Sequence, residues 1–82
     1  MTNIAIFVSG SGSNAQNIIT FFKNDTTINV VVVMSNNSNS YALKRAESLQ
    51  VSTIVFDKKQ LLNRGGIIKT LQELNVHFIV LA

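Results

Sequence analysis

The sequence contains no cysteine, which excludes disulfide bonds and metal centres built on cysteine ligands. Chains without disulfides are typical of the cell interior, so we expect a cytoplasmic location. The apolar runs all fall short of the ~18 residues needed to cross a membrane. The residues before the first run also lack the basic charges of a signal peptide. A membrane is therefore not an expected partner.

Charged residues are also scarce, at 13% of the chain against the ~25% of an ordinary globular protein. Hydrophobic residues reach 46%, which indicates a folded, core-rich chain. A small free-standing domain usually carries more surface charge. We therefore interpret residues 1–82 as one N-terminal domain whose apolar surface meets further protein. The Lys and Arg residues are scattered and not interleaved with aromatic residues, so nucleic acid is not an expected partner either.

Four short apolar runs have the composition of buried strands. They are residues 3–8, 28–34, 51–56 and 77–81. Runs that are apolar on both faces are typical of a parallel sheet covered by helices on both sides. The order of elements then predicts an α/β fold, a Rossmann-like three-layer parallel sheet (β-α-β-α-β-α-β) with right-handed crossovers.

The segments between these runs place apolar residues at helical spacing, from about 14 to 23 and from 41 to 49. A third helical region precedes the last run. Gly65-Gly66 interrupts this region, so two starting points for the helix stay open, one near Lys58 and one after Gly66.

The stretch from Ser9 to Asn14 links the first strand to the first helix and contains Gly10 and Gly12. Glycine allows a sharp backbone turn and the close approach of a ligand. The following helix presents unpaired N–H groups and the positive end of its dipole, which together favour a phosphate group. Gly10-x-Gly12-x-x-Ala15 also fits the dinucleotide-binding fingerprint. The plainest interpretation is a Gly/Ser turn with an ordinary helix cap.

The type of ligand can be narrowed further. A dinucleotide site needs an acidic residue after the second strand to bind the ribose hydroxyls, and the sequence there is Met34-Ser35-Asn36-Asn37. A Walker-type phosphate loop needs a Gly-Lys pair that is absent here. The residues therefore favour a phosphorylated small molecule held by backbone N–H groups and by Ser and Asn side chains.

Ligands of such sheets bind beyond the carboxyl ends of the strands. Four segments should share that edge, namely residues 9–14, 35–36 and 57–59 and whatever follows Ala82. We expect the last strand to be central in the sheet, and we therefore interpret the chain as a fragment of a longer protein.

Several motifs match one known family in order along the whole chain. They are Ile4–Asn14 with its Ser-Gly-Ser-Gly-Ser-Asn loop, Val33–Asn37, Ala42–Ala46, Phe56-Asp57 and Phe78–Ala82. In these motifs the chain resembles the N-terminal half of the phosphoribosylglycinamide formyltransferases, also called glycinamide ribonucleotide transformylases. The resemblance implies the N-terminal part of the formyltransferase fold. It also implies a purine-biosynthesis enzyme that transfers a formyl group from 10-formyltetrahydrofolate, a co-substrate, to the amine of glycinamide ribonucleotide, without a metal ion.

The resemblance also implies roles for particular residues. It assigns the substrate phosphate to Gly12, Ser13 and Asn14. It places a folate contact at Lys59, where the family usually has an arginine, and a lysine keeps the charge but loses the planar fork. The family's catalytic Asn, His and Asp lie beyond the Leu-Ala that ends this chain, so no catalytic residue is assigned within it. We expect the chain alone to be inactive, with the remainder of the enzyme as its partner and a homodimer left open.

Other candidate residues have simpler structural interpretations. His77, the single histidine, begins the last strand at the end of the sheet opposite the expected site. Asp57 is more typical of a helix cap, and Lys58 and Lys59 of solvated surface. Two alternatives stay open beside the formyltransferase. One is a Rossmann-type nucleotide- or dinucleotide-binding module, and the other is a flavodoxin-like regulatory or interaction domain without phosphate affinity.

Overall fold

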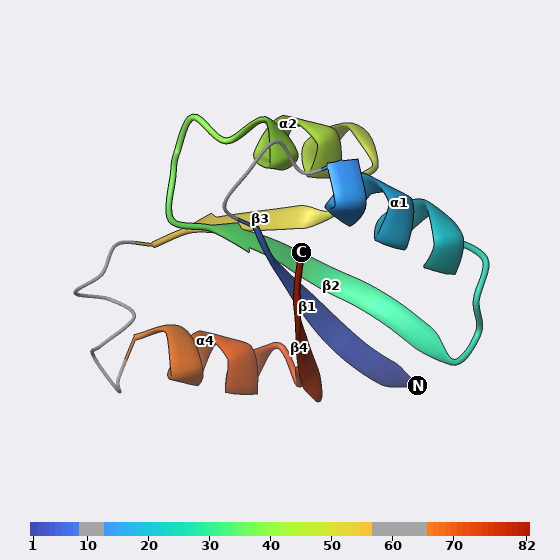
Figure 1. The fold of residues 1–82 in the computed structure, drawn as a ribbon. Coiled ribbons are helices and arrows are strands. Elements are labelled where there is room, and N and C mark those ends of the chain that lie inside the picture. Colours follow the sequence, from blue (N-terminus) through green and yellow to red (C-terminus); the bar gives the residue numbers. More distant parts are fainter. Residues whose placement is uncertain (9–12, 57–65) are drawn as a thin grey trace.

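Strands and helices alternate along the chain in the computed structural model, which describes residues 1–8, 13–56 and 66–82 (Figure 1). The elements are β1 (Thr2–Val8), α1 (Ser13–Phe22), β2 (Ile28–Ser35), α2 (Tyr41–Ser48), β3 (Ser52–Val55), α4 (Ile67–Glu73) and β4 (Phe78–Leu81). The predicted strands and the first two predicted helices are confirmed, each end lying within about one residue of its expected position, the usual uncertainty of helix and strand ends. Helix α4 begins directly after Gly66, and the alternative start near Lys58 lies outside the described residues.

The four described strands form one parallel sheet in the order β3-β2-β1-β4. Helices α1 and α2 lie on one side of this sheet and α4 lies on the other (Figure 1). This is the three-layer, Rossmann-like α/β architecture that the sequence predicts. The arrangement follows from chain connectivity, since parallel strands need a crossover and each crossover here carries a helix.

The face under α1 and α2 holds one cluster of buried side chains. Its members are Ile6, Val8, Ala15, Ile19, Val33, Ala42 and Ala46. The two helices contribute alanines where they lie against the strands, because a small side chain lets a helix approach a sheet closely. The isoleucine and valines fill the space between these layers, and this half of the core is closed to solvent.

The opposite face holds a second and smaller cluster under α4. Its members are Ala5, Val32, Met34, Phe56 and Ile67. Ala5 and Val32 are the sequence neighbours of Ile6 and Val33, which belong to the first cluster, because successive side chains of a strand point to opposite faces. The continuous apolar runs of β1 and β2 are therefore explained by burial on both faces.

The expectation that the fourth strand is central concerns the sheet of a longer protein, and it stays a prediction. Within the described sheet β4 is an edge strand, paired with β1 alone. Its side chains are also much more exposed than those of β1 and β2, at 65% for Phe78, 51% for Ile79 and 80% for Leu81. The reason is the crossover through α4, which carries the chain from β3 past β2 and β1 to the far edge. An apolar run alone does not reveal which position in the sheet its strand takes.

Candidate anion site at the carboxyl edge of the sheet

The carboxyl ends of the strands are level with one another. Val8 at the end of β1 pairs with Ser35 at the end of β2, and Ser35 pairs with Val55 at the end of β3. On the other side of β1, Phe7 pairs with Leu81. This register confirms that the segments after β1, β2 and β3 leave the sheet at a single edge.

The first turn of α1 lies at this edge. Ala15 is 1% exposed and packs in the same cluster as Val8, the last residue of β1. The helix has no acidic residue in its first turn, so its own side chains do not neutralise the positive end of the dipole. Backbone N–H groups at a helix N-terminus are of the kind that favours an anion supplied from outside the helix.

The structure describes only some of the predicted site residues. Asn14 is exposed in the first turn of α1. Ser13 is the first residue of α1, and its side chain lies outside what the structure describes. Gly12 and Lys59 also lie outside the described residues, and the same holds for the expected caps and surface positions at Asp57 and Lys58.

The loop after β2 is held by its own hydrogen bonds. The hydroxyl of the fully buried Ser35 donates to the carbonyl oxygen of Asn37 at 3.2 Å and accepts from its backbone N–H at 3.1 Å. The Asn37 side chain accepts from the backbone N–H of Asn39 at 2.9 Å. The loop then leads into Ser40, whose hydroxyl accepts from Ala42 N–H at the start of α2. This loop has no carboxylate for a ribose, as its sequence indicates.

One contact at this edge is not evident from the sequence. Arg45 of α2 donates from Nη1 to the side-chain oxygen of Gln16 in the first turn of α1. Its guanidinium carbon also lies 4.7 Å from the centre of the Tyr41 ring. The helical spacing of Tyr41 and Arg45 could have indicated that second contact. The link to Gln16 depends on how α1 and α2 pack, and helical spacing alone places Arg45 on the solvent face.

His77 lies at the opposite edge of the sheet, where its expected structural role is confirmed. Its Nδ1 accepts a hydrogen bond from the backbone N–H of Asn3 at 2.9 Å, and its own backbone N–H donates to the Asn3 carbonyl at 2.7 Å. The imidazole therefore helps to align the start of β4 with β1. It lies at the amino ends of the strands and takes no part in the candidate site.

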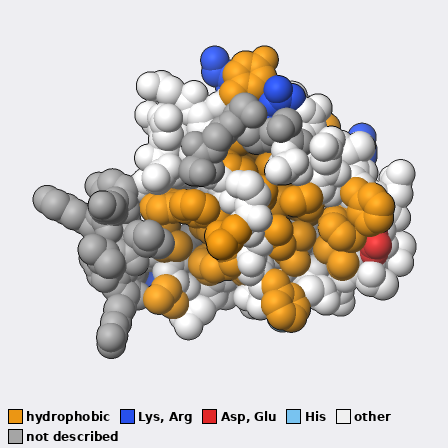
Figure 2. Space-filling view, viewed as in Figure 1, with side chains coloured by type: hydrophobic (Ala, Val, Ile, Leu, Met, Phe, Trp, Pro, Cys, Tyr) orange, Lys and Arg blue, Asp and Glu red, His pale blue; other side chains and the backbone are white. Residues whose placement is uncertain are grey.

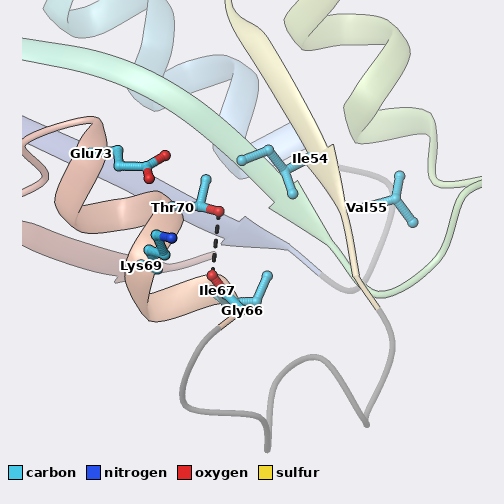
Figure 3. A pocket seen from close by; sticks show the side chains of 7 residues that line it. All are labelled: Ile54, Val55, Gly66, Ile67, Lys69, Thr70 and Glu73. Carbon is cyan, nitrogen blue, oxygen red and sulfur yellow. Dashed lines mark hydrogen bonds between the residues drawn. The ribbon is translucent and has the colours of Figure 1, made fainter.

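Two grooves flank α4. One has a volume of about 340 Å³ and lies between β3 and α4, where the Thr70 hydroxyl donates to the Gly66 carbonyl (Figure 3). The other, of about 290 Å³, is apolar. It is lined by Phe7, Met34, Phe56, Ile67, Ile79 and Leu81. Neither groove contains Asn14 or another described residue of α1, so neither coincides with the candidate anion site.

Searches for other kinds of site were confined to the described residues. There, no three His, Cys, Asp or Glu side chains come together as a metal ion would require. Within the same part of the chain, every helix is too short or too polar to cross a membrane.

The sheet order, the level carboxyl edge and the crossover helices define an α/β protein of the Rossmann-like class. Residues 2–82 match the formyl transferase family, and the chain belongs to that family. The phosphoribosylglycinamide formyltransferase of Haemophilus influenzae is 37% identical over 87 residues, covering 100% of this chain and 41% of that protein. The trifunctional purine biosynthetic protein adenosine-3 of Gallus gallus is 32% identical over 96% of this chain and 8% of its own length.

Solved structures give the same result for the fold. The phosphoribosylglycinamide formyltransferase of Anaplasma phagocytophilum superposes with a TM-score of 0.87 at 26% identity, covering 99% of this chain and 39% of that one. The glycinamide ribonucleotide transformylase 1 of Symbiobacterium toebii superposes with a TM-score of 0.83 at 29% identity. The chain thus spans 41% of the H. influenzae protein and 39% of the A. phagocytophilum chain.

Proposed function

We propose that residues 1–82 are the N-terminal, phosphate-binding part of a phosphoribosylglycinamide formyltransferase of purine biosynthesis. In the proposed reaction the amine nitrogen of glycinamide ribonucleotide forms a bond to the formyl carbon of 10-formyltetrahydrofolate. The bond from that carbon to N10 of the folate breaks, and the amine gives up a proton as tetrahydrofolate takes one. Membership of the formyl transferase family and the names of the relatives support this proposal.

The phosphate of the substrate is assigned to Gly12, Ser13 and Asn14. The observation that carries this assignment is the position of the first turn of α1 at the carboxyl edge, with Asn14 exposed and no acidic residue in that turn. A phosphate monoester there would accept hydrogen bonds from backbone N–H groups and from the Asn14 amide, and it would complement the helix dipole. Lys59 is proposed as a folate contact on the basis of the family resemblance alone.

The acid–base groups of the reaction are proposed to lie outside residues 1–82, so that this chain alone transfers no formyl group. His77 supports this proposal by its place at the far edge of the sheet, hydrogen-bonded to Asn3. The exposed apolar side chains of β4 support the proposal that the remainder of such an enzyme is a partner of this domain. A cytoplasmic location completes the proposal, which leaves the oligomeric state open.

A titration of the isotope-labelled 82-residue chain tests the proposed phosphate site. Glycinamide ribonucleotide should shift the amide resonances of Asn14 and Ala15, whereas its dephosphorylated riboside should leave them unchanged. Asn14→Ala should weaken binding about tenfold, since it removes one hydrogen bond to a charged group. Asn17→Ala is the matched control, because Asn17 is also an exposed asparagine of α1, one turn further along.

The same titration separates the proposal from its rivals. Tighter binding of NAD or NADP than of glycinamide ribonucleotide would favour a dinucleotide-binding module. No phosphate-dependent shift at Asn14 and Ala15 would overturn the phosphate site and leave the interaction domain as the better interpretation. Formyl transfer by the purified 82-residue chain would overturn the proposal that its catalytic groups lie elsewhere.

A further inference from the structure

We propose that the hydrogen bond from the backbone N–H of Asn3 to Nδ1 of His77 is a proton-sensitive contact, which holds the start of β4 against β1 and opens in mild acid. Histidine is the side chain whose charge ordinarily changes between about pH 5 and pH 8. His77 directly precedes Phe78, the first residue of β4, and it is exposed, so solvent protons reach its ring. The proposal concerns the edge of the sheet opposite the proposed phosphate site and does not depend on that site.

The donor in this hydrogen bond fixes the state of the imidazole. A backbone N–H donates but cannot accept, so Nδ1 of His77 must carry the lone pair that receives it, at 2.9 Å. The single proton of the neutral ring then lies on Nε2. A second proton would have to bind at Nδ1, where it would face the N–H of Asn3, donor against donor. Uptake of that proton and the hydrogen bond to Asn3 therefore exclude each other.

The imidazole extends the pairing of two strands beyond their backbone ladder. The register of β1 and β4 begins at Ile4 and Phe78, and the ring of His77 adds Asn3 to it. Two further hydrogen bonds join the same segments, since His77 N–H donates to the Asn3 carbonyl at 2.7 Å and Asn3 Nδ2 donates to the Asn75 carbonyl at 3.1 Å. Only the bond to the imidazole can titrate. A proton on the ring should therefore loosen the start of β4 without detaching the strand.

The charged groups of the elements around His77 do not pair with it. Lys69 and Glu73, the charged residues of α4, line the groove between α4 and β3 (Figure 3). The Asp25 carboxylate is hydrogen-bonded within the turn before β2, and β1 lies between β2 and β4. Neither carboxylate forms an ion pair with His77 in the described part of the chain, and the amines of Lys69 and Met1 have the same charge as a protonated ring. Protonation therefore gains no partner that would offset the lost hydrogen bond.

Ring and amide resonances of the isotope-labelled 82-residue chain test the contact directly. At about pH 7.5 the nitrogen chemical shifts of His77 should show a neutral ring with its proton on Nε2. Between about pH 7.5 and pH 5 the Asn3 amide should lose about two- to tenfold of its protection against solvent exchange, measured relative to an unstructured peptide at each pH, which is the effect of one hydrogen bond. The Thr2 amide is the internal control, because it donates to Thr27 on the β2 side. A proton on Nδ1 at pH 7.5, or equal losses at Thr2 and Asn3, would overturn the inference.

Two substitutions at His77 separate the ring from other titrating groups. His77→Asn keeps a side-chain acceptor but takes up no proton in this range, so the Asn3 amide should stay protected down to pH 5. His77→Ala removes the acceptor and should give the low protection at every pH. Glu73→Gln is the matched control, because it removes the carboxyl nearest to His77 in the sequence and should leave the acid step unchanged.

An acid step of wild-type size in His77→Asn would mean that another group is responsible, and it would overturn the inference. Loss of the step in Glu73→Gln would do the same. If the His77 variants do not fold, the wild type alone decides, because the Asn3 amide shift must follow protonation of the His77 ring with the same midpoint. Different midpoints for the two signals would contradict the proposed contact.

Discussion

Strands β1 and β4 lie side by side and have similar apolar sequences, but their surroundings differ sharply. Ala5 of β1 is completely buried, whereas Ile79, its register partner in β4, is 51% exposed. Figure 2 shows the result as apolar side chains gathered on the side of the molecule that carries β1 and β4. An apolar strand therefore contributes to the core of this chain only where helices and neighbouring strands cover it.

The largest expected effect separates these two strands. Ile6→Ala should lower the free energy of unfolding by about 2–5 kcal/mol, since it leaves a cavity in a closed core. Ile79→Ala removes the same atoms from a half-exposed site and should cost about 1 kcal/mol. Urea denaturation of both variants measures the difference. Equal losses would mean that β4 is covered in solution, and the contrast between the strands would disappear.

A smaller effect concerns association through the exposed edge. Phe78→Lys places a charge on β4, which should raise several-fold the concentration at which the chain self-associates, because charged edge strands resist pairing. Its effect on unfolding should stay within about 0.5 kcal/mol. Sedimentation velocity over a range of concentrations measures the association.

Phe21→Lys is the control for that experiment. Phe21 is 78% exposed, comparable with the 65% of Phe78, but it lies on α1 and away from the strand edge. If both substitutions suppress association equally, exposed apolar area in general is responsible, and β4 has no special part in it.

The smallest effect is expected in the turn that leads into β2. Hydrogen bonds from the Thr27 hydroxyl and from the backbone N–H groups of Thr27 and Ile28 lower the pKa of Asp25 below its ordinary value. A carboxyl whose pKa is lowered by folding stabilises the fold above its unfolded pKa. That contribution disappears as the pH falls through the lowered folded value.

Wild type should therefore lose stability below about pH 4 more steeply than Asp25→Asn, which keeps an oxygen acceptor but has no titrating group. Urea midpoints between pH 2 and pH 6 follow this difference. Hydrogen exchange at Thr27 should respond to acid before exchange at Val80 in β4, because the Thr27 backbone N–H donates directly to the Asp25 carboxylate. Parallel curves for the two proteins would show that the Asp25 turn does not contribute.

The sequence was sufficient for much of the fold. The continuous valines of β2 and the helical spacing of α1 locate these elements to within about one residue, since local propensity and burial agree there. The position of the Gly/Ser loop between a strand and a helix likewise predicts an anion site, and this stays a prediction. Asn14, one of its proposed residues, is exposed in the first turn of α1.

Other features required the tertiary structure. Nothing in residues 78–81 indicates that this strand pairs with β1, because strand order is set by where a crossover returns to the sheet and not by the strand's own composition. The link between Arg45 and Gln16 joins residues 29 positions apart, and it exists only because α1 and α2 pack on the same face.

Taken by itself, the amino-acid sequence determined which segments become strands and helices, since these depend on side chains and backbone groups close together in the chain. The tertiary structure alone decided the strand order, which places β4 beside β1, and that a half-buried arginine contacts Gln16 in the first turn of α1. Both are consequences of packing between distant segments, which local sequence does not encode.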